Sequence, residues 1–208
     1  MKRTFTVFAA IAFVLMVSSV SQAGVVTIAT FADPSGSGAN PLFTIDSDNG
    51  NINGGWDDSK TGLSLNIVYA SKVYNDAWFT MSTLTYGGGY SGTIGAGVVK
   101  FYADGDASTE TPILQINFSS AYLNPGGIAA QELFIVGGII TIAGVDISEL
   151  LINEAFSFSF ANHVLTPGNN GFTATAAFTS SAEVVPEPAT IALLGLGALA
   201  LLRRRKSV

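Results

Sequence analysis

Short runs of alternating apolar and polar residues recur through the middle of this 208-residue chain. In AFSFSFA (155–161), three phenylalanines share one face and two serines share the other. In GFTATAAFT (171–179), phenylalanine and alanine alternate with threonine. A period of two with one apolar face is typical of half-buried strands in an antiparallel sheet. Both runs are therefore predicted to be β-strands.

Further β-rich runs are separated by residues that form turns, such as Gly, Pro, Asn and Asp. They are VVTIATF (25–31), LSLNIVYA (63–70), WFTMSTLTY (78–86), AGVVKFYA (96–103), PILQINFSS (112–120), ELFIV (132–136) and IITIAGV (139–145). Only DISELLINE (146–154) has the pattern of a short helix. About nine strands at this spacing predict an all-β domain, either an antiparallel β-sandwich or a jelly roll. The region from 24 to 183 is long enough to bury a core without disulfides, and the chain has no cysteine.

The N-terminal segment has the layout of a secretory signal peptide. Lys2 and Arg3 precede an apolar stretch at 5–17, and small residues follow in Ser21-Gln22-Ala23. This order of a cationic, an apolar and a small-residue region predicts cleavage after residue 23. We therefore expect residues 1–23 to be removed between Ala23 and Gly24, leaving a domain at 24–183.

The C-terminal segment at 184–208 contains an apolar run followed by a cationic cluster. The run at 189–202 has 14 residues without charge, so as a helix it covers about 21 Å of a bilayer. Arginine side chains that snorkel extend its effective length. We predict a transmembrane helix with a cytoplasmic stop, formed by Arg203, Arg204, Arg205 and Lys206. The cations at 2–3 prefer the same side, which places the middle of the chain outside the cytoplasm.

A Pro-Glu-Pro sequence precedes this apolar run. Pro186 and Pro188 lack amide protons, and each pushes the preceding residue towards extended backbone. The motif is therefore expected to be a stiff, accessible peptide, and Glu187 lies near the positive end of the predicted helix.

The tail resembles the PEP-CTERM sorting signal of bacterial surface proteins. The matching features are VPEPAT at 185–190, IALLGLGALALL at 191–202 and RRRK at 203–206. The resemblance implies recognition by an exosortase, a membrane enzyme that processes such tails near Pro-Glu-Pro. Pro186, Glu187 and Pro188 are then substrate residues, and the protein is expected to be an inner-membrane-anchored intermediate before it reaches the cell surface or extracellular matrix.

Charge is distributed unevenly along the chain. Of the nine cations, six lie at the two ends, and fifteen acidic residues lie between those ends with only Lys60, Lys72 and Lys100. Such an acidic surface repels phosphate backbones, so we expect no nucleic-acid partner. It suits solubility, cation binding or a hydrated polysaccharide matrix.

The densest polar stretch is IDSDNGNINGGWDDS at 45–59. Asp46, Asp48, Asp57 and Asp58 offer the hard oxygen ligands that calcium prefers. The order of residues fails as an EF-hand, because the glycine comes one position early and aspartate replaces the usual glutamate at the last position. Two interpretations remain, a weak calcium site and a solvated Asn/Asp/Gly loop. No other cofactor is expected.

Catalytic residues are scarce. His163 is the single histidine, which leaves a Ser-His-Asp set possible and a multi-histidine zinc site impossible. Ser91 lies in GGYSGT, where Thr93 replaces the second glycine of G-x-S-x-G. We therefore expect that the protein is not an enzyme. A secreted hydrolase of unknown type ranks third, after the two binding and structural functions given next.

The expected function is that of an exported structural or adhesive protein. The alternative is a carbohydrate-binding module associated with exopolysaccharide, assisted by calcium. Aromatic side chains stack on sugar rings, although they also form sheet cores and cross-strand pairs. The candidates are Trp56, Tyr69, Tyr74, Trp78, Tyr86 and Tyr90. Expected partners are the secretion machinery, the exosortase, the membrane and polysaccharide.

Overall fold

A computed structural model describes residues 24–32, 41–56, 62–103, 111–132, 140–142, 150–168 and 170–185. The predicted signal peptide at 1–23 and the predicted transmembrane helix at 189–202 lie outside these residues. Within the described part of the chain, no helix has both the length and the apolar character needed to cross a bilayer. The residues of Val25–Ile147 and Leu151–Glu183 form one compact unit, which we call the body.

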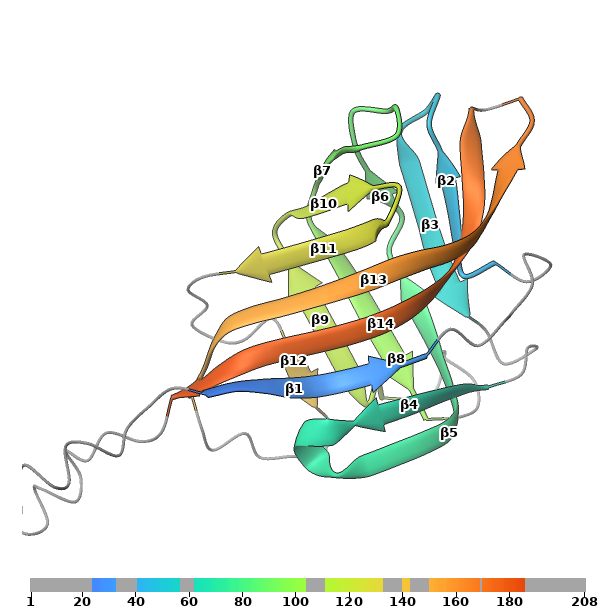
Figure 1. Cartoon of the computed structure of the whole chain (residues 1–208). Helices are drawn as coiled ribbons and strands as arrows, with labels where there is room; N and C mark the ends of the chain where they lie inside the picture. The colour runs from blue at the N-terminus through green and yellow to red at the C-terminus, as the bar shows by residue number, and fades with distance from the viewer. Residues whose placement is uncertain are drawn as a thin grey trace, which may run out of the picture. The chain divides into compact units, whose positions relative to one another are not determined.

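The described residues form strands and a single 3-10 turn (Figure 1). The register of every strand pair recorded here is antiparallel. The predicted all-β, antiparallel class is therefore confirmed. The elements are β1 (Gly24–Phe31), β2 (Phe43–Asp46), β3 (Asn51–Trp56), β4 (Leu63–Ile67), η1 (Val68–Ala70), β5 (Lys72–Met81), β6 (Leu84–Thr85), β7 (Gly92–Ile94), β8 (Gly97–Tyr102), β9 (Leu114–Phe118), β10 (Ala121–Asn124), β11 (Gly127–Glu132), β12 (Ile140–Ile142), β13 (Leu150–Thr166) and β14 (Gly171–Val185).

The strands form one continuous sheet that folds into two layers, with β3 in both strand orders. One layer runs in the order β7-β10-β11-β13-β14-β2-β3, and the other runs β12-β9-β8-β5-β3. β1 pairs with β14 and β4, and β4 pairs with β5, so β3 and β5 connect the layers. In Figure 1, β11, β13, β14 and β1 cross in front of β8 and β9. The two layers therefore pack face to face, with strands that cross.

Phenylalanine rings fill the space between the layers. Phe158 of β13 lies 5.7 Å from Phe79 of β5 between ring centroids, and Phe178 of β14 lies 4.9 Å from Phe101 of β8. Phe31 of β1 contacts all four of these rings. The alternation that predicted β13 and β14 puts these rings on one face, and burying that face is the main favourable contribution to folding.

The structure contains more strands than the sequence pattern predicts. Two of the missed strands, β2 and β3, fall partly or wholly in the polar run at 45–59, for which a weak calcium site and a solvated loop are the two interpretations from sequence. Their inward residues include Ile45, Ile52 and Trp56, all buried, while polar residues or glycine occupy the alternate positions. Gly54 is required to be small, because a Cβ there would lie 2.6 Å from the ring of Phe43. Its role is close packing rather than loop formation.

The helix expected at 146–154 is wrong over the part that is described. β13 begins at Leu150, and Asn153 has a φ of 50°, a left-handed conformation that interrupts a helix. Leu151 and Glu154 are both buried although they are three residues apart, so the face that points inward changes at Asn153. This shift in phase is typical of a β-bulge.

Candidate functional site

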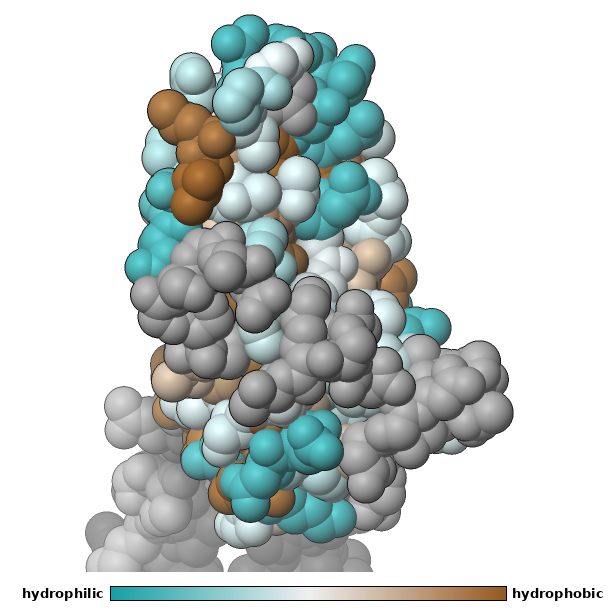
Figure 2. All heavy atoms as spheres, turned by 90° about the vertical axis from the view of Figure 1, so that its right-hand side faces the viewer, coloured by the Kyte–Doolittle hydropathy of each residue, from teal (hydrophilic) through white to brown (hydrophobic). Residues whose placement is uncertain are grey.

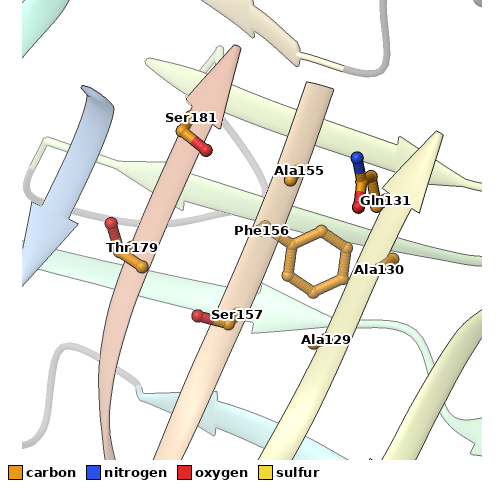
Figure 3. Close-up of a pocket in the computed structure, with 8 residues that line it drawn as sticks. All are labelled: Ala129, Ala130, Gln131, Ala155, Phe156, Ser157, Thr179 and Ser181. Atoms are coloured by element: carbon orange, nitrogen blue, oxygen red, sulfur yellow. The ribbon is translucent and has the colours of Figure 1, made fainter. Parts of the chain in front are cut away.

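A shallow hollow of about 380 Å³ lies on the outer face of β11, β13 and β14 (Figure 3). The register pairs Ala129 with Ser157 and Gln131 with Ala155. The outward side chains on three neighbouring strands are mostly small, so the outer surface of the sheet is recessed there. The lining residues are Ala129, Ala130, Gln131, Ala155, Phe156, Ser157, Thr179 and Ser181.

Tyr122 of β10 borders this hollow. It lies opposite Ala129 in the register, and its side chain is 52% exposed. Directly opposite residues on one face of a sheet have Cβ atoms about 5 Å apart, so the ring lies beside the hollow. Ala121 and Leu123 on either side are buried, which fixes Tyr122 on the outer face.

The hollow and its border combine one exposed aromatic ring with hydroxyl and amide groups. Ser157, Thr179 and Ser181 supply hydroxyls, and Gln131 supplies an amide. Sites for small molecules characteristically join apolar lining to a few polar groups that fix orientation. This arrangement is chemically compatible with a hydroxyl-rich ring that has an apolar face, such as a pyranose.

Two of the six predicted sugar-binding aromatics are core residues. Trp56 and Trp78 are buried, with 3% and 5% of their surface exposed. Trp78 stacks on Tyr102, its cross-strand partner, at 4.3 Å between ring centroids and 13° between planes. Tyr90 is exposed. The alternation of AYLN at 121–124 is the sequence signal that would have found Tyr122.

The acidic cluster begins in the turn between β2 and β3. One carboxylate oxygen of Asp46 accepts hydrogen bonds from the backbone amides of Asp48 and Asn49, at 3.2 and 3.0 Å. The other accepts a hydrogen bond from the Asn49 side chain at 2.7 Å. The Asn49 side chain and then its backbone amide lower the pKa of Asp46, because both hydrogen bonds favour the charged form.

The same turn joins its neighbours at one end of the body, which we call the distal end. Asp48 accepts a hydrogen bond from the Asn170 side chain at 2.9 Å, and the carbonyl of Ser47 accepts one from the amide of Gly89 at 3.1 Å. Hydrophilic side chains cover much of the upper part of the molecule in Figure 2. The distal end therefore joins hydrogen-bonded polar turns to an exposed apolar patch.

The calcium prediction stays a prediction. Asp57 and Asp58 lie outside the described residues. Among the residues that are described, no three His, Asp or Glu side chains gather as metal ligands. The bonds of Asp46 and Asp48 fit the alternative interpretation, a turn in which aspartate binds its own backbone.

His163 lies near the distal end, where its ring contacts two neighbouring segments. Its Nε2 lies 2.8 Å from the carbonyl of Pro125 and donates the hydrogen bond, since a carbonyl only accepts. Its ring also packs 5.0 Å from Phe172. His163 thus connects β13 to the turn between β10 and β11. Ser91 is exposed.

The last strand, β14, leads up to the start of the tail. Ala182 is buried, and Glu183 accepts a hydrogen bond from the side chain of Asn153 at 2.9 Å. β14 extends to Val185, and Pro186 is the next residue. The Pro-Glu-Pro sequence therefore follows the last strand directly.

Residues 184–206 match the PEP-CTERM protein-sorting motif. The match confirms the resemblance seen in the sequence. The PEP-CTERM motif indicates an exported protein that is sorted through its C-terminus, and it implies recognition by an exosortase-type enzyme. Comparisons with curated proteins and with solved structures found no match. Ala23, residues 186–188 and the cations at 203–206 lie outside the described residues, so their predicted roles stay predictions.

Proposed function

We propose that the chain is a structural or adhesive protein of the cell surface or extracellular matrix, delivered by its PEP-CTERM tail. The signal peptide is removed at export, and the apolar run at 189–202 holds the tail in the inner membrane. Pro186, Glu187 and Pro188 present the extended peptide that the exosortase recognises. The catalytic step belongs to the exosortase, and no catalysis is assigned to the body.

The observation that carries this proposal is the PEP-CTERM match at 184–206. It is supported by the N-terminal segment, since export explains both ends of the chain together. The stable β-sheet body and the excess of acidic residues also suit a hydrated extracellular setting.

The test is to replace Pro186, Glu187 and Pro188 with alanine and to follow the protein in its host. The variant is expected to keep its full C-terminal mass and to stay with the inner membrane. Pro167→Ala, which removes an exposed proline outside the motif, is the matched control and is expected to be processed normally. Normal processing of the triple variant would contradict the proposal.

A second function, carbohydrate binding, is favoured by the hollow beside Tyr122. Oligosaccharides from the host exopolysaccharide are titrated into the exported protein by calorimetry. Tyr122→Ala is expected to weaken binding about tenfold or more, which corresponds to about 1.4 kcal/mol. Tyr90→Ala is the control, because Tyr90 is similarly exposed, at 56%, but lies in the segment before β7 and is not paired with a residue of the hollow.

Calcium enters this second proposal through the four candidate aspartates. Titrations with calcium and with a chelator separate a calcium-assisted site from a calcium-independent one. Affinity that is the same under both conditions removes calcium from the proposal. A lack of binding to any exopolysaccharide fragment removes the carbohydrate function.

A further inference from the structure

We infer that the body has a lipid-facing surface at the end opposite its distal end. This proximal end consists of the start of β1 at Val25, the turn between β4 and β5 at 68–72, and the end of β14 at Glu183. The inference rests on the proposed membrane-held tail. It adds which surface of the body meets the bilayer and which side chains contact it.

Hydrogen bonds place the first and last strands of the body side by side. The Thr30 hydroxyl donates to the carbonyl of Phe178 at 2.9 Å, and the Ser180 hydroxyl donates to the carbonyl of Ala29 at 3.5 Å. The two strands therefore run in opposite directions, and the start of β1 lies beside the end of β14. Figure 1 shows that β1 begins where β14 ends, so the chain enters and leaves the body at one end.

The turn between β4 and β5 lies on the same side. Thr30 of β1 pairs with Asn66 of β4 in antiparallel register, so residues after Asn66 run along the first half of β1. The turn consists of the 3-10 segment Val68–Ala70 and Ser71, whose φ is 53°. Figure 1 shows this turn on the side where β1 starts.

The length of the chain brings this end close to the bilayer. Five residues lie between Glu183 and Ala189, the start of the apolar run, so six Cα-to-Cα steps separate the two. Fully extended, they span at most about 20 Å. The polar headgroup region on one side of a bilayer is itself about 5–8 Å thick. A body held by this tail therefore cannot move far from the lipid surface.

The side chains at the proximal end suit a lipid interface. Val25 is 72% exposed and Val68 is 41% exposed. Lys72 is exposed and is the only charged residue between 62 and 73 in this acidic chain. Exposed apolar side chains enter the interface, and a cation is attracted to anionic headgroups. The distal end has comparably exposed apolar side chains at Val164 and Leu165. It carries Asp46 and Asp48, however, which such headgroups repel, so charge and the reach of the tail distinguish the two ends.

The chain has no cysteine, so single cysteines report on each end separately. Val68→Cys and Val25→Cys probe the proximal end. Val164→Cys and Leu165→Cys are the distal controls, because these residues are similarly exposed, at 49% and 74%. Each variant carries a polarity-sensitive fluorophore. The exported, tail-bearing protein is reconstituted in vesicles of phosphatidylethanolamine and phosphatidylglycerol that contain a nitroxide-labelled lipid as quencher.

The expected result is at least twofold stronger quenching, with a blue shift, at the two proximal positions than at the two distal ones. Lys72→Glu is expected to reduce quenching at position 68, whereas Lys100→Glu on β8 leaves it unchanged. Equal quenching at all four positions in protein that floats with the vesicles would overturn the inference and leave the proposed function intact. Protein that does not float with the vesicles would instead refute the membrane-held tail, and the inference with it.

Discussion

Removal of the ring at Phe158 is expected to destabilise the body strongly. Phe158 is 1% exposed, and its ring centroid lies 4.9 Å from that of Phe43, 5.0 Å from Phe178 and 5.7 Å from Phe79. Substitutions of buried phenylalanine by alanine cost about 3–5 kcal/mol, and the value grows with the cavity that remains. The neighbours belong to strands in both layers and cannot all move inward, so we expect Phe158→Ala to cost about 4 kcal/mol or more.

Urea unfolding followed by tryptophan fluorescence measures this cost. Trp56 and Trp78 are both buried, so their emission reports loss of the core. In a domain of this size, 4 kcal/mol also lowers the melting temperature by about 8–16 °C. Phe158→Leu keeps most of the apolar volume and is expected to cost much less than Phe158→Ala.

Ser159→Ala is the matched control, since Ser159 is the next residue of β13 and is exposed. It is expected to change stability by less than about 0.5 kcal/mol. If Phe158→Ala lowered stability no more than this control does, the rings would not be the core that joins the two layers. The description of the fold would then be wrong at its centre.

Two further predictions concern single positions in turns and strands. Gly127 has a φ of 149°, and a Cβ there would overlap the carbonyl of Phe158. Gly127→Ala is therefore expected to cost more than about 1 kcal/mol of unfolding free energy, measured by urea unfolding. Gly87→Ala is the control and is expected to stay near neutral, because the space around Gly87 is open. The folded-state pKa of Asp46 lies below its ordinary value of 3.8, so the stability that it contributes is present above pH 3.8 and is lost as the pH falls through the lower folded pKa. Asp46→Asn is therefore expected to lower the urea midpoint more at pH 6 than at pH 2; equal effects at both pH values would contradict this reasoning.

The sequence predicted the fold class wherever one face of a strand is apolar throughout. β13 and β14 show this best, because phenylalanine and alanine repeat at every second residue and those residues are buried. β2, β3 and β10 were missed because each is short, with polar residues or glycine at the alternate positions. Local pattern carries too little information in strands of four to six residues, and pairing with neighbours decides their structure.

Thr175 shows a second limit of the pattern. Alternation placed it on the polar, outward face, yet it is fully buried. Asn162, with a φ of 51°, lies against it and donates a side-chain hydrogen bond to its hydroxyl at 2.9 Å. A left-handed residue in a neighbouring strand cannot be recognised from the period of the strand itself.

The functional features likewise include one that the sequence predicts and one that it does not. The PEP-CTERM tail was recognisable because its three features follow one another in the sequence. The hollow beside Tyr122 depends on the register of β10, β11 and β13, which brings together residues that are far apart in the chain. Local sequence carries no signal for such a set.

The direct passage of β14 into Pro-Glu-Pro also determines how the body carries a mechanical load. Any pull on the tail acts along the axis of a strand that lies between β1 and β13. Hydrogen bonds between antiparallel strands are perpendicular to the strand axis, so a force along that axis shears many of them at once instead of opening them one by one. A protein tethered at this point resists tension with a whole strand of the sheet.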